Sequence, residues 1–253
     1  MNNPPHSRRA EMPALQLTGS TTLLPRMQRI AEAYMETHAV RIVVNGGCGT
    51  ARGYKALLDG TTDIAMASGT APDDLAAAAA ARGLPFRATV VRRDAIVPLV
   101  HASNPVDALT LLQLRNVFTG RIADWARLGG PRAPIKVLVG PPTGGVSTSW
   151  RQRLLGADDT CTPLARVLGT ADRLARMAAR PFTITYAPHM AVPPHLKVLR
   201  IADTAPGDKV FAPLMLVTLG PWTLPAARFI AYAAAAGDAG DAGAAASAEA
   251  DRA

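Results

Sequence analysis

The chain has 253 residues, of which 49% are hydrophobic and only 5% aromatic, so a sizeable core must rest on Ala, Val, Leu and Ile. This length is enough for two lobes of ordinary domain size, and no apolar run approaches the roughly 20 residues of a membrane-spanning helix. The net charge is +8, but the basic residues are scattered without interleaved aromatics and show no zinc-ligand spacing, so we expect no nucleic-acid partner. A diffuse positive field would instead favour the capture of a small anion.

The first predicted strand and turn lie near the N-terminus. Residues 14–17 form a short apolar run, and the following Gly-Ser-Thr-Thr segment places Ser20, Thr21 and Thr22 where an amphipathic helix begins. Pro25 fits the first turn of that helix, where its missing N–H is not needed. The free N–H groups at such a helix start attract an oxyanion, although Ser and Thr before a helix are also common as simple N-caps.

The same order of strand and small polar turn recurs three times along the chain. Turns at the carboxyl ends of parallel strands in α/β proteins converge on one crevice, where ligands bind. The four turns together therefore predict one polar pocket that holds an anion. The three further strands are expected over 40–44, 62–66 and 135–139, with turns over 45–50, 67–70 and 140–148 and helices over 51–59 and 149–155.

Several motifs, in this order, resemble those of the phosphate-binding proteins that serve ABC importers, within the type II periplasmic-binding-protein fold. The resemblance covers about residues 15–233, and Phe118 to Gly130 is its most specific part. The motifs are residues 19–22 with Pro25, Gly46-Gly47-x-Gly49 followed by Gly53-x-Lys55-Ala56-Leu57, Asp63 to Ser68, Arg93 to Val97, Asn104-Pro105-Val106 with Leu109 to Leu114, Phe118 to Gly130, and Ile184-Thr185-Tyr186.

The resemblance implies an α/β, two-lobed fold in which each lobe is a mostly parallel sheet flanked by helices, with a two-strand hinge near Ile96 and Ile184. Hinge closure of a monomer around an oxyanion, most simply phosphate, would create the form that an ABC permease at the membrane recognises. The implied divisions are residues 1–13 as a disordered N-terminus, 14–97 with 183–234 as lobe 1, 98–182 as lobe 2, and 235–253 as a disordered Ala/Gly/Asp tail.

Two positions depart from the family at the ligand. An ungapped match puts Gly140 where the family carries an Arg, and Gly69 where phosphate binders usually place an Asp or an Arg. Losing a bidentate Arg weakens phosphate binding roughly ten- to a hundredfold, unless Arg52, Arg93 or Arg151 replaces it. The ligand-binding residues that the resemblance implies are Ser20, Thr21, Thr22, Thr50, Ser68, Thr143, Gly144, Gly145 and Ser147.

An enzyme is not expected from these residues. The five histidines have no Ser, Cys or carboxylate at a catalytic spacing, and no metal-ligand cluster, dinucleotide fingerprint or P-loop occurs. We therefore expect no catalytic residue, metal or cofactor. The resemblance implies instead a solute-binding protein that delivers an oxyanion to an ABC importer. Two alternatives stay open: a non-transport member of the same fold that acts as a sensor or protein-interaction scaffold, and a binder of molybdate, tungstate, sulfate or a carboxylate.

The cellular location follows from the resemblance, which implies a periplasmic or extracytoplasmic place. Residues 1–12 contain no apolar core of a signal peptide, so a cytoplasmic place also stays open. Cys48 and Cys161 do not decide the compartment, because a pair at this separation is compatible with a disulfide and with two free thiols.

Overall fold

The computed structural model describes residues 14–47, 49–69, 73–156, 159–203 and 210–236; the expectations for the N-terminal segment, Cys48 and the tail beyond residue 236 lie outside them. The chain divides into two compact units. Unit 1 contains residues 1–66, 76–91 and 216–253, and unit 2 contains residues 67–75 and 92–215. The predicted α/β class, a mostly parallel sheet flanked by helices, is confirmed.

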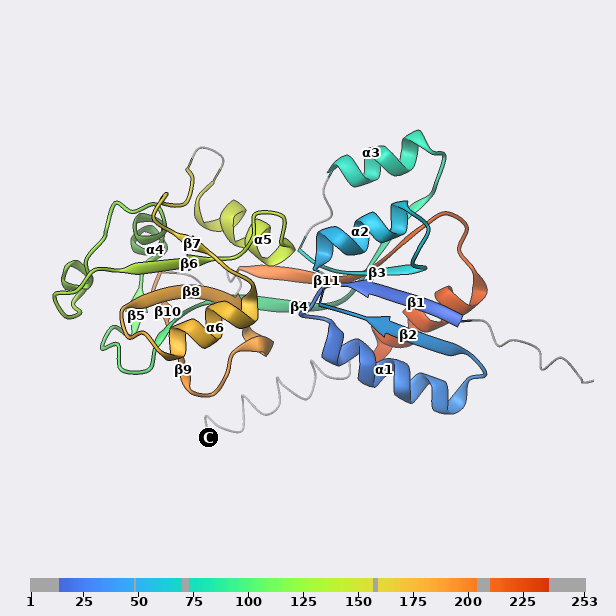
Figure 1. The fold of residues 1–253 in the computed structure, drawn as a ribbon, viewed down its shortest axis with the longest axis horizontal. Helices are drawn as coiled ribbons and strands as arrows, with labels where there is room; N and C mark the ends of the chain where they lie inside the picture. Colours follow the sequence, from blue (N-terminus) through green and yellow to red (C-terminus); the bar gives the residue numbers. More distant parts are fainter. Residues whose placement is uncertain (1–13, 48, 70–72, 157–158, 204–209, 237–253) are drawn as a thin grey trace, which may run out of the picture. The chain divides into compact units, whose positions relative to one another are not determined.

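Unit 1 is built on parallel strands around its first strand (Figure 1). β1 (Ala14–Gly19) pairs in parallel with β2 (Arg41–Asn45) and with β3 (Ile64–Ser68), so the carboxyl ends of these strands share one edge. Leu15 and Leu17 are buried while Gln16 and Thr18 are partly exposed, which is the two-residue alternation of a half-buried strand.

Helices of unit 1 use their apolar stripe to cover these strands. In α1 (Leu24–Thr37), Met27, Ile30 and Tyr34 recur at helical spacing and are buried, as the sequence predicts. The Tyr34 ring packs edge-on against Phe229, 5.4 Å between centroids, and so joins α1 to the helix over residues 224–236. The remaining helices that contribute to this unit are α2 (Thr50–Leu58) and α3 (Asp73–Ala81).

Two long strands, β4 (Phe86–His101) and β11 (Phe211–Leu219), contribute residues to both units. In the strand order, β11 lies between β3 and β4. Within unit 2, β8 (Thr183–Pro188) pairs antiparallel with β4 and parallel with β6 (Lys136–Val139). The shorter strands are β7 (Arg166–Val167), parallel to β6; β9 (Leu196–Val198), antiparallel to β4; and β5 (Ala108–Leu109) with β10 (Arg200–Ile201), a separate parallel pair.

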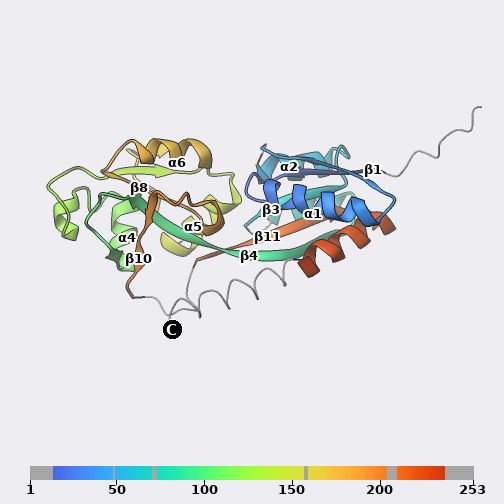
Figure 2. The same cartoon turned by 90° about the horizontal axis from the view of Figure 1, so that it is seen from below.

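The sheet of unit 2 is covered on both faces, with α6 on one face and α4 and α5 on the other (Figure 2). Trp150 of α5 stacks on Tyr186 of β8 with 4.9 Å between ring centroids, and Phe118 packs against both rings. Trp125 is fully buried in the same core, so the motif Phe118 to Gly130 mainly supplies packing. The helices are α4 (Leu111–Phe118), α5 (Gly145–Leu154), α6 (Thr170–Ala178), and the 3-10 turns η1 (Trp125–Leu128) and η2 (His189–Ala191).

No helix among the described residues has the length and apolar character needed to cross a bilayer.

Candidate functional site

The first polar turn of unit 1 lies against the start of α2. The Ser20 amide donates to the Met66 carbonyl at 2.8 Å, and the Gly49 amide donates to the Gly19 carbonyl at 3.1 Å. Gly53 permits this approach, because an added Cβ there would lie 2.9 Å from both Gly19 Cα and the Thr18 carbonyl oxygen. The first two predicted turns therefore meet within unit 1.

The hydroxyl residues of these two turns differ in exposure. Ser20 and Thr50 are 2% and 6% exposed, whereas Thr21 is exposed and Thr22 is half-buried. The structure thus brings Ser20 and Thr50 into one buried corner and leaves Thr21 at the surface of unit 1.

Three helices begin directly after these polar turns without a side-chain cap. The residues that precede them are Leu23 for α1, Gly49 for α2 and Gly144 for α5, and none of the three provides a side-chain hydrogen bond to the helix start. By contrast, Thr110 caps α4 in a full capping box with Gln113. The interpretation of Ser20 to Thr22 as a simple N-cap is therefore wrong, because Leu23 precedes α1 and no side chain caps it.

The third and fourth polar turns meet in unit 2. An added Cβ at Gly145 would overlap the Ser68 carbonyl oxygen, and one at Gly69 would overlap Gly145. The Gly69 amide donates to the Pro213 carbonyl at 2.9 Å, and Gly69 has a φ of +88°, in the left-handed region that favours glycine. Ser68 and the first residue of α5 are thus in direct contact.

The helix α5 begins at Gly145, four residues before the expected start at Ser149. Ser147 therefore lies in the first turn of the helix and is 3% exposed, whereas Thr143 is exposed and Gly144 half-buried. The sequence Gly-Gly-Val-Ser has poor intrinsic helix propensity, which explains why the pattern alone placed the start too late.

Gly140 directly follows β6, at the position where the resemblance places an arginine. Its amide donates to the Tyr186 hydroxyl at 3.0 Å. An added Cβ would overlap the Ser147 hydroxyl and would lie 3.4 Å from Nη2 of Arg173. A side chain at position 140 would therefore displace the Ser147 hydroxyl and lie in contact with the cation of Arg173.

Arg173 of α6 is a buried guanidinium that the sequence analysis missed. It is 1% exposed and donates to Thr185 Oγ1 at 3.3 Å, to the Tyr186 carbonyl at 3.1 Å and to Thr170 Oγ1 at 3.1 Å. Its Cζ lies 4.6 Å from the centroid of the Tyr186 ring. Burial lowers the pKa of Arg173, and the contact with Tyr186 partly offsets that effect.

The three arginines named from the sequence as replacement cations, Arg52, Arg93 and Arg151, are all exposed. The signal that could have identified Arg173 is its place on the apolar stripe of α6, next to the buried Leu174 and four residues before the buried Met177. A cation on that stripe is unusual, because arginine is rarely buried without a partner.

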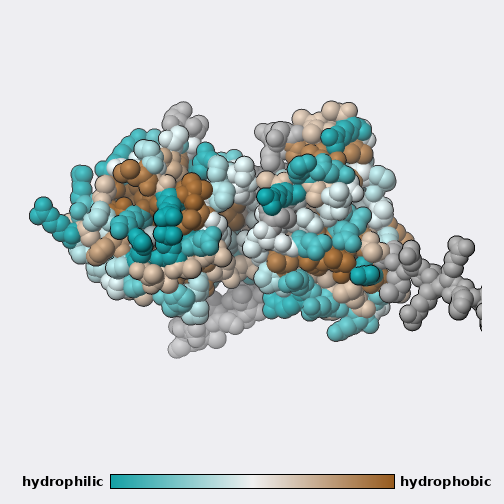
Figure 3. Space-filling view, viewed as in Figure 1, coloured by the Kyte–Doolittle hydropathy of each residue, from teal (hydrophilic) through white to brown (hydrophobic). Residues whose placement is uncertain are grey.

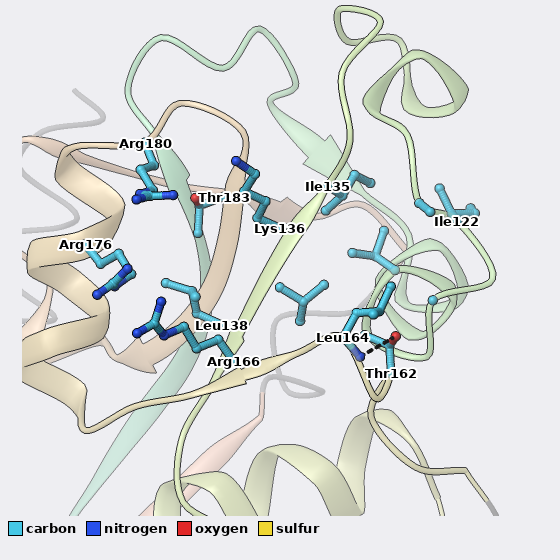
Figure 4. A pocket seen from close by; sticks show the side chains of 14 residues that line it. Ile122, Ile135, Lys136, Leu138, Thr162, Leu164, Arg166, Arg176, Arg180 and Thr183 are labelled. Carbon is cyan, nitrogen blue, oxygen red and sulfur yellow. Dashed lines mark hydrogen bonds between the residues drawn. The ribbon is translucent and has the colours of Figure 1, made fainter.

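A separate basic pocket lies in unit 2 (Figure 4). It has a volume of about 360 Å³, and Lys136, Arg166, Arg176 and Arg180 line it together with apolar residues such as Leu138. Figure 3 shows apolar and hydrophilic surface side by side on this unit. None of the predicted ligand-binding residues lines this pocket, so it is distinct from the turns described above.

The remaining reactive groups of the described residues include one cysteine and several carboxylates and histidines. Cys161 is a free, half-buried thiol, and burial raises its pKa. Within the described ranges, no group of three or more His, Cys, Asp or Glu side chains is arranged to hold a metal ion.

Comparison with curated proteins finds phosphate-binding proteins. Phosphate-binding protein PstS 2 of Streptococcus agalactiae is 31% identical over 112 residues, which are 44% of this chain and 36% of that protein. The chain therefore matches little more than a third of this relative's length.

Two solved structures share the fold over most of the chain. A protein of Clostridium perfringens, described as a phosphate ABC transporter substrate-binding protein and solved with bound phosphate, has a TM-score of 0.76 at 24% identity and covers 87% of this chain and 92% of its own. An ABC-type phosphate transport receptor of Vibrio cholerae has a TM-score of 0.68 at 21% identity and covers 87% of this chain and 93% of its own.

A family model described as a PBP superfamily domain matches residues 4–249. These residues include nearly the whole chain, and the chain therefore belongs to the PBP superfamily domain family.

Proposed function

We propose that this protein binds an oxyanion, phosphate first, and delivers it to an ABC importer. The observation that carries the proposal is the set of three helices, α1, α2 and α5, that begin without side-chain caps beside the strand ends of their units. Uncapped amides at the positive end of the helix dipole bind an oxyanion without a cationic side chain in contact with it.

The proposed ligand-binding residues fall into two groups. In unit 1 they are Ser20, Thr21, Thr22 and Thr50, and in unit 2 they are Ser68, Thr143, Gly144, Gly145 and Ser147. The buried hydroxyls are the ones that we expect to contribute most, because a hydrogen bond in buried surroundings competes less with water; they belong to Ser20, Thr50, Ser68 and Ser147.

The names of the relatives support phosphate as the first ligand, since PstS 2 of S. agalactiae is named a phosphate-binding protein and the C. perfringens structure contains phosphate. We propose accordingly that the protein is a monomer without enzymatic activity, that it works outside the cytoplasm, and that a membrane permease is its partner. Closure of the two units on the anion is part of the same proposal.

Selectivity among oxyanions depends on the residue after Ser68. A carboxylate there would accept the proton of hydrogen phosphate and repel fully ionised sulfate, but this chain has Gly69 at that position. We therefore expect this protein to discriminate between phosphate and sulfate less strongly than a binder with an Asp at that place.

The test is a calorimetric titration of the full chain with phosphate, sulfate, molybdate, tungstate and small carboxylates. Saturable binding of phosphate supports the proposal, and a Thr50→Ala variant should bind it several-fold more weakly, while Thr61→Ala, an exposed residue at the far end of α2, serves as the control. If only another anion of the panel binds, that anion replaces phosphate as the proposed ligand. If no anion of the panel binds, a sensor or scaffold role is favoured.

A further inference from the structure

Arg173 is a buried positive charge without a carboxylate partner among the described residues. Its three hydrogen bonds go to neutral acceptors on Thr170, Thr185 and Tyr186. A guanidinium has five N–H donors, and here Nε has no hydrogen-bond partner in the described structure. A buried charge without a counter-charge is unfavourable, because burial removes its hydration and nothing of opposite sign replaces it.

The guanidinium lies beside the start of α5. The Cβ position of Gly140 is 3.4 Å from Nη2 of Arg173 and coincides with the space of the Ser147 hydroxyl. The guanidinium and the Ser147 hydroxyl therefore both lie next to Gly140, the residue that follows β6. In the described structure the amides of Gly145, Val146 and Ser147 have no acceptor within the helix, as expected for its first turn.

We propose that Arg173 supplies the counter-charge for the anion that binds at the amino end of α5, an inference that rests on the proposed oxyanion-binding function. The guanidinium acts across surroundings of low dielectric constant, and it does not have to contact the ligand. Arg173 is thus an electrostatic residue, and Gly140, without a side chain, leaves room for the Ser147 hydroxyl beside it.

The chemical class of ligand follows from this arrangement. The Coulomb energy between the guanidinium and the ligand grows with the ligand's charge, so Arg173 favours doubly charged oxyanions, such as hydrogen phosphate or sulfate, over singly charged ones, such as formate. An uncharged residue at position 173 should therefore reduce the affinity for dianions more than the affinity for monoanions.

The experiment compares wild type with Arg173→Met, Arg173→Lys and Arg176→Met. Arg176 is the matched control, because it lies on the same helix but lines the separate basic pocket. Calorimetric titrations with inorganic phosphate, sulfate and formate give the affinities, and thermal denaturation without added anion gives the stability of each variant.

The proposal expects Arg173→Met to bind phosphate and sulfate about tenfold more weakly or worse, and to lose less affinity for formate. It also expects the anion-free melting temperature of this variant to stay the same or rise, because an unpaired buried charge has been removed. Arg173→Lys should recover part of the affinity, and Arg176→Met should bind as wild type does.

Several results would overturn the proposal. If Arg173→Met binds phosphate as tightly as wild type does, or loses equal affinity for dianions and formate, the positive charge of Arg173 does not contribute to anion binding. A large fall in melting temperature in both Arg173 variants would assign the residue a purely structural role. If Arg176→Met alone loses anion binding, the anion binds in the basic pocket and not at the start of α5. Failure of wild type to bind any anion would instead refute the proposed function itself, and the inference with it.

Discussion

At the scale of single residues, Gly140 is a crowded position. Its amide donates to the Tyr186 hydroxyl, and an added Cβ would overlap the Ser147 hydroxyl and lie 3.4 Å from Nη2 of Arg173. The constraint on residue 140 is one of space, since Gly140 is not among the glycines with positive φ. The two side chains that border it come from different helices, Ser147 from α5 and Arg173 from α6.

We predict that Gly140→Ala displaces the Ser147 hydroxyl and destabilises the protein by about 1–3 kcal/mol, as overpacking in a filled core does. Chemical denaturation measures this change, and a titration with phosphate should show weaker binding. The control is Gly169→Ala, where an added Cβ would lie 3.7 Å from the Asp172 carboxylate in ordinary contact. Equal stability of the two variants would contradict the crowding at residue 140.

A second prediction concerns Asp94, which is 6% exposed and accepts a hydrogen bond from the Met190 amide at 3.3 Å. Burial raises the pKa of Asp94 from 3.8, against the smaller opposing effects of the Met190 hydrogen bond, Arg92 and His189. The folded protein thus holds this proton more tightly than the unfolded chain does. The stabilisation is complete below the unfolded pKa and is lost as the pH rises through the folded pKa.

We therefore expect Asp94→Asn to melt at a higher temperature than wild type near pH 7, because the amide keeps an acceptor for Met190 and carries no charge to bury. The difference should shrink as the pH falls toward and below 4. Thermal denaturation at a series of pH values checks this. An Asp94→Asn variant less stable than wild type at pH 7 would mean that the ionised carboxylate is stabilised by its cationic neighbours.

At the scale of elements, the helices divide by how they begin. Thr110 and Gln113 close a capping box at α4, where the Gln113 amide donates to Thr110 Oγ1 at 3.1 Å. The starts of α1, α2 and α5 have no such cap. We expect a structural role for the capped start of α4, and the starts of α1, α2 and α5 are the proposed anion-binding elements. The start of α6, which follows Gly169, also lacks a side-chain cap and is not part of the proposal.

Thr110→Ala should accordingly cost about 1 kcal/mol of stability and lower the melting temperature by about 2–4 °C, with no change in phosphate affinity. Denaturation and titration of the same preparation separate the two effects. A change in affinity at unchanged stability would show that the start of α4 also contributes to ligand binding.

Short-range features of these elements could be predicted from the sequence. The turn at Ser20 and the turn that ends at Thr50 were predicted correctly as helix starts, because glycine, hydroxyl residues and an apolar stripe mark them locally. The start of α5 was misplaced, since Gly145 to Ser147 lack helix propensity and are fixed by contact with Ser68. Arg173 was missed because its neighbours at Gly140 and Tyr186 are brought near it only by tertiary packing.

At the scale of the whole molecule, the net charge of +8 is spread over the chain and is available to attract an anion at long range. Such steering acts on the encounter rate and is screened by salt, with a Debye length of about 30 Å at 0.01 M ionic strength and about 10 Å at 0.1 M.

We predict that the association rate constant for phosphate falls by roughly tenfold between low and high ionic strength, while the dissociation rate changes less. Stopped-flow measurements in a chloride series would show this. A rate constant independent of ionic strength would show that capture does not depend on the diffuse positive field.

The division of unit 1 into three chain segments has a consequence for biosynthesis. Phe229 in the helix over residues 224–236 packs against Tyr34 of α1, so the hydrophobic partner of α1 leaves the ribosome long after α1 itself. Unit 2 is assembled mostly from residues 92–215 and can gather its core earlier during translation. Premature termination before residue 224 would therefore leave α1 with uncovered apolar surface, a substrate for chaperones and proteases, even though every proposed anion-binding residue had already been synthesised.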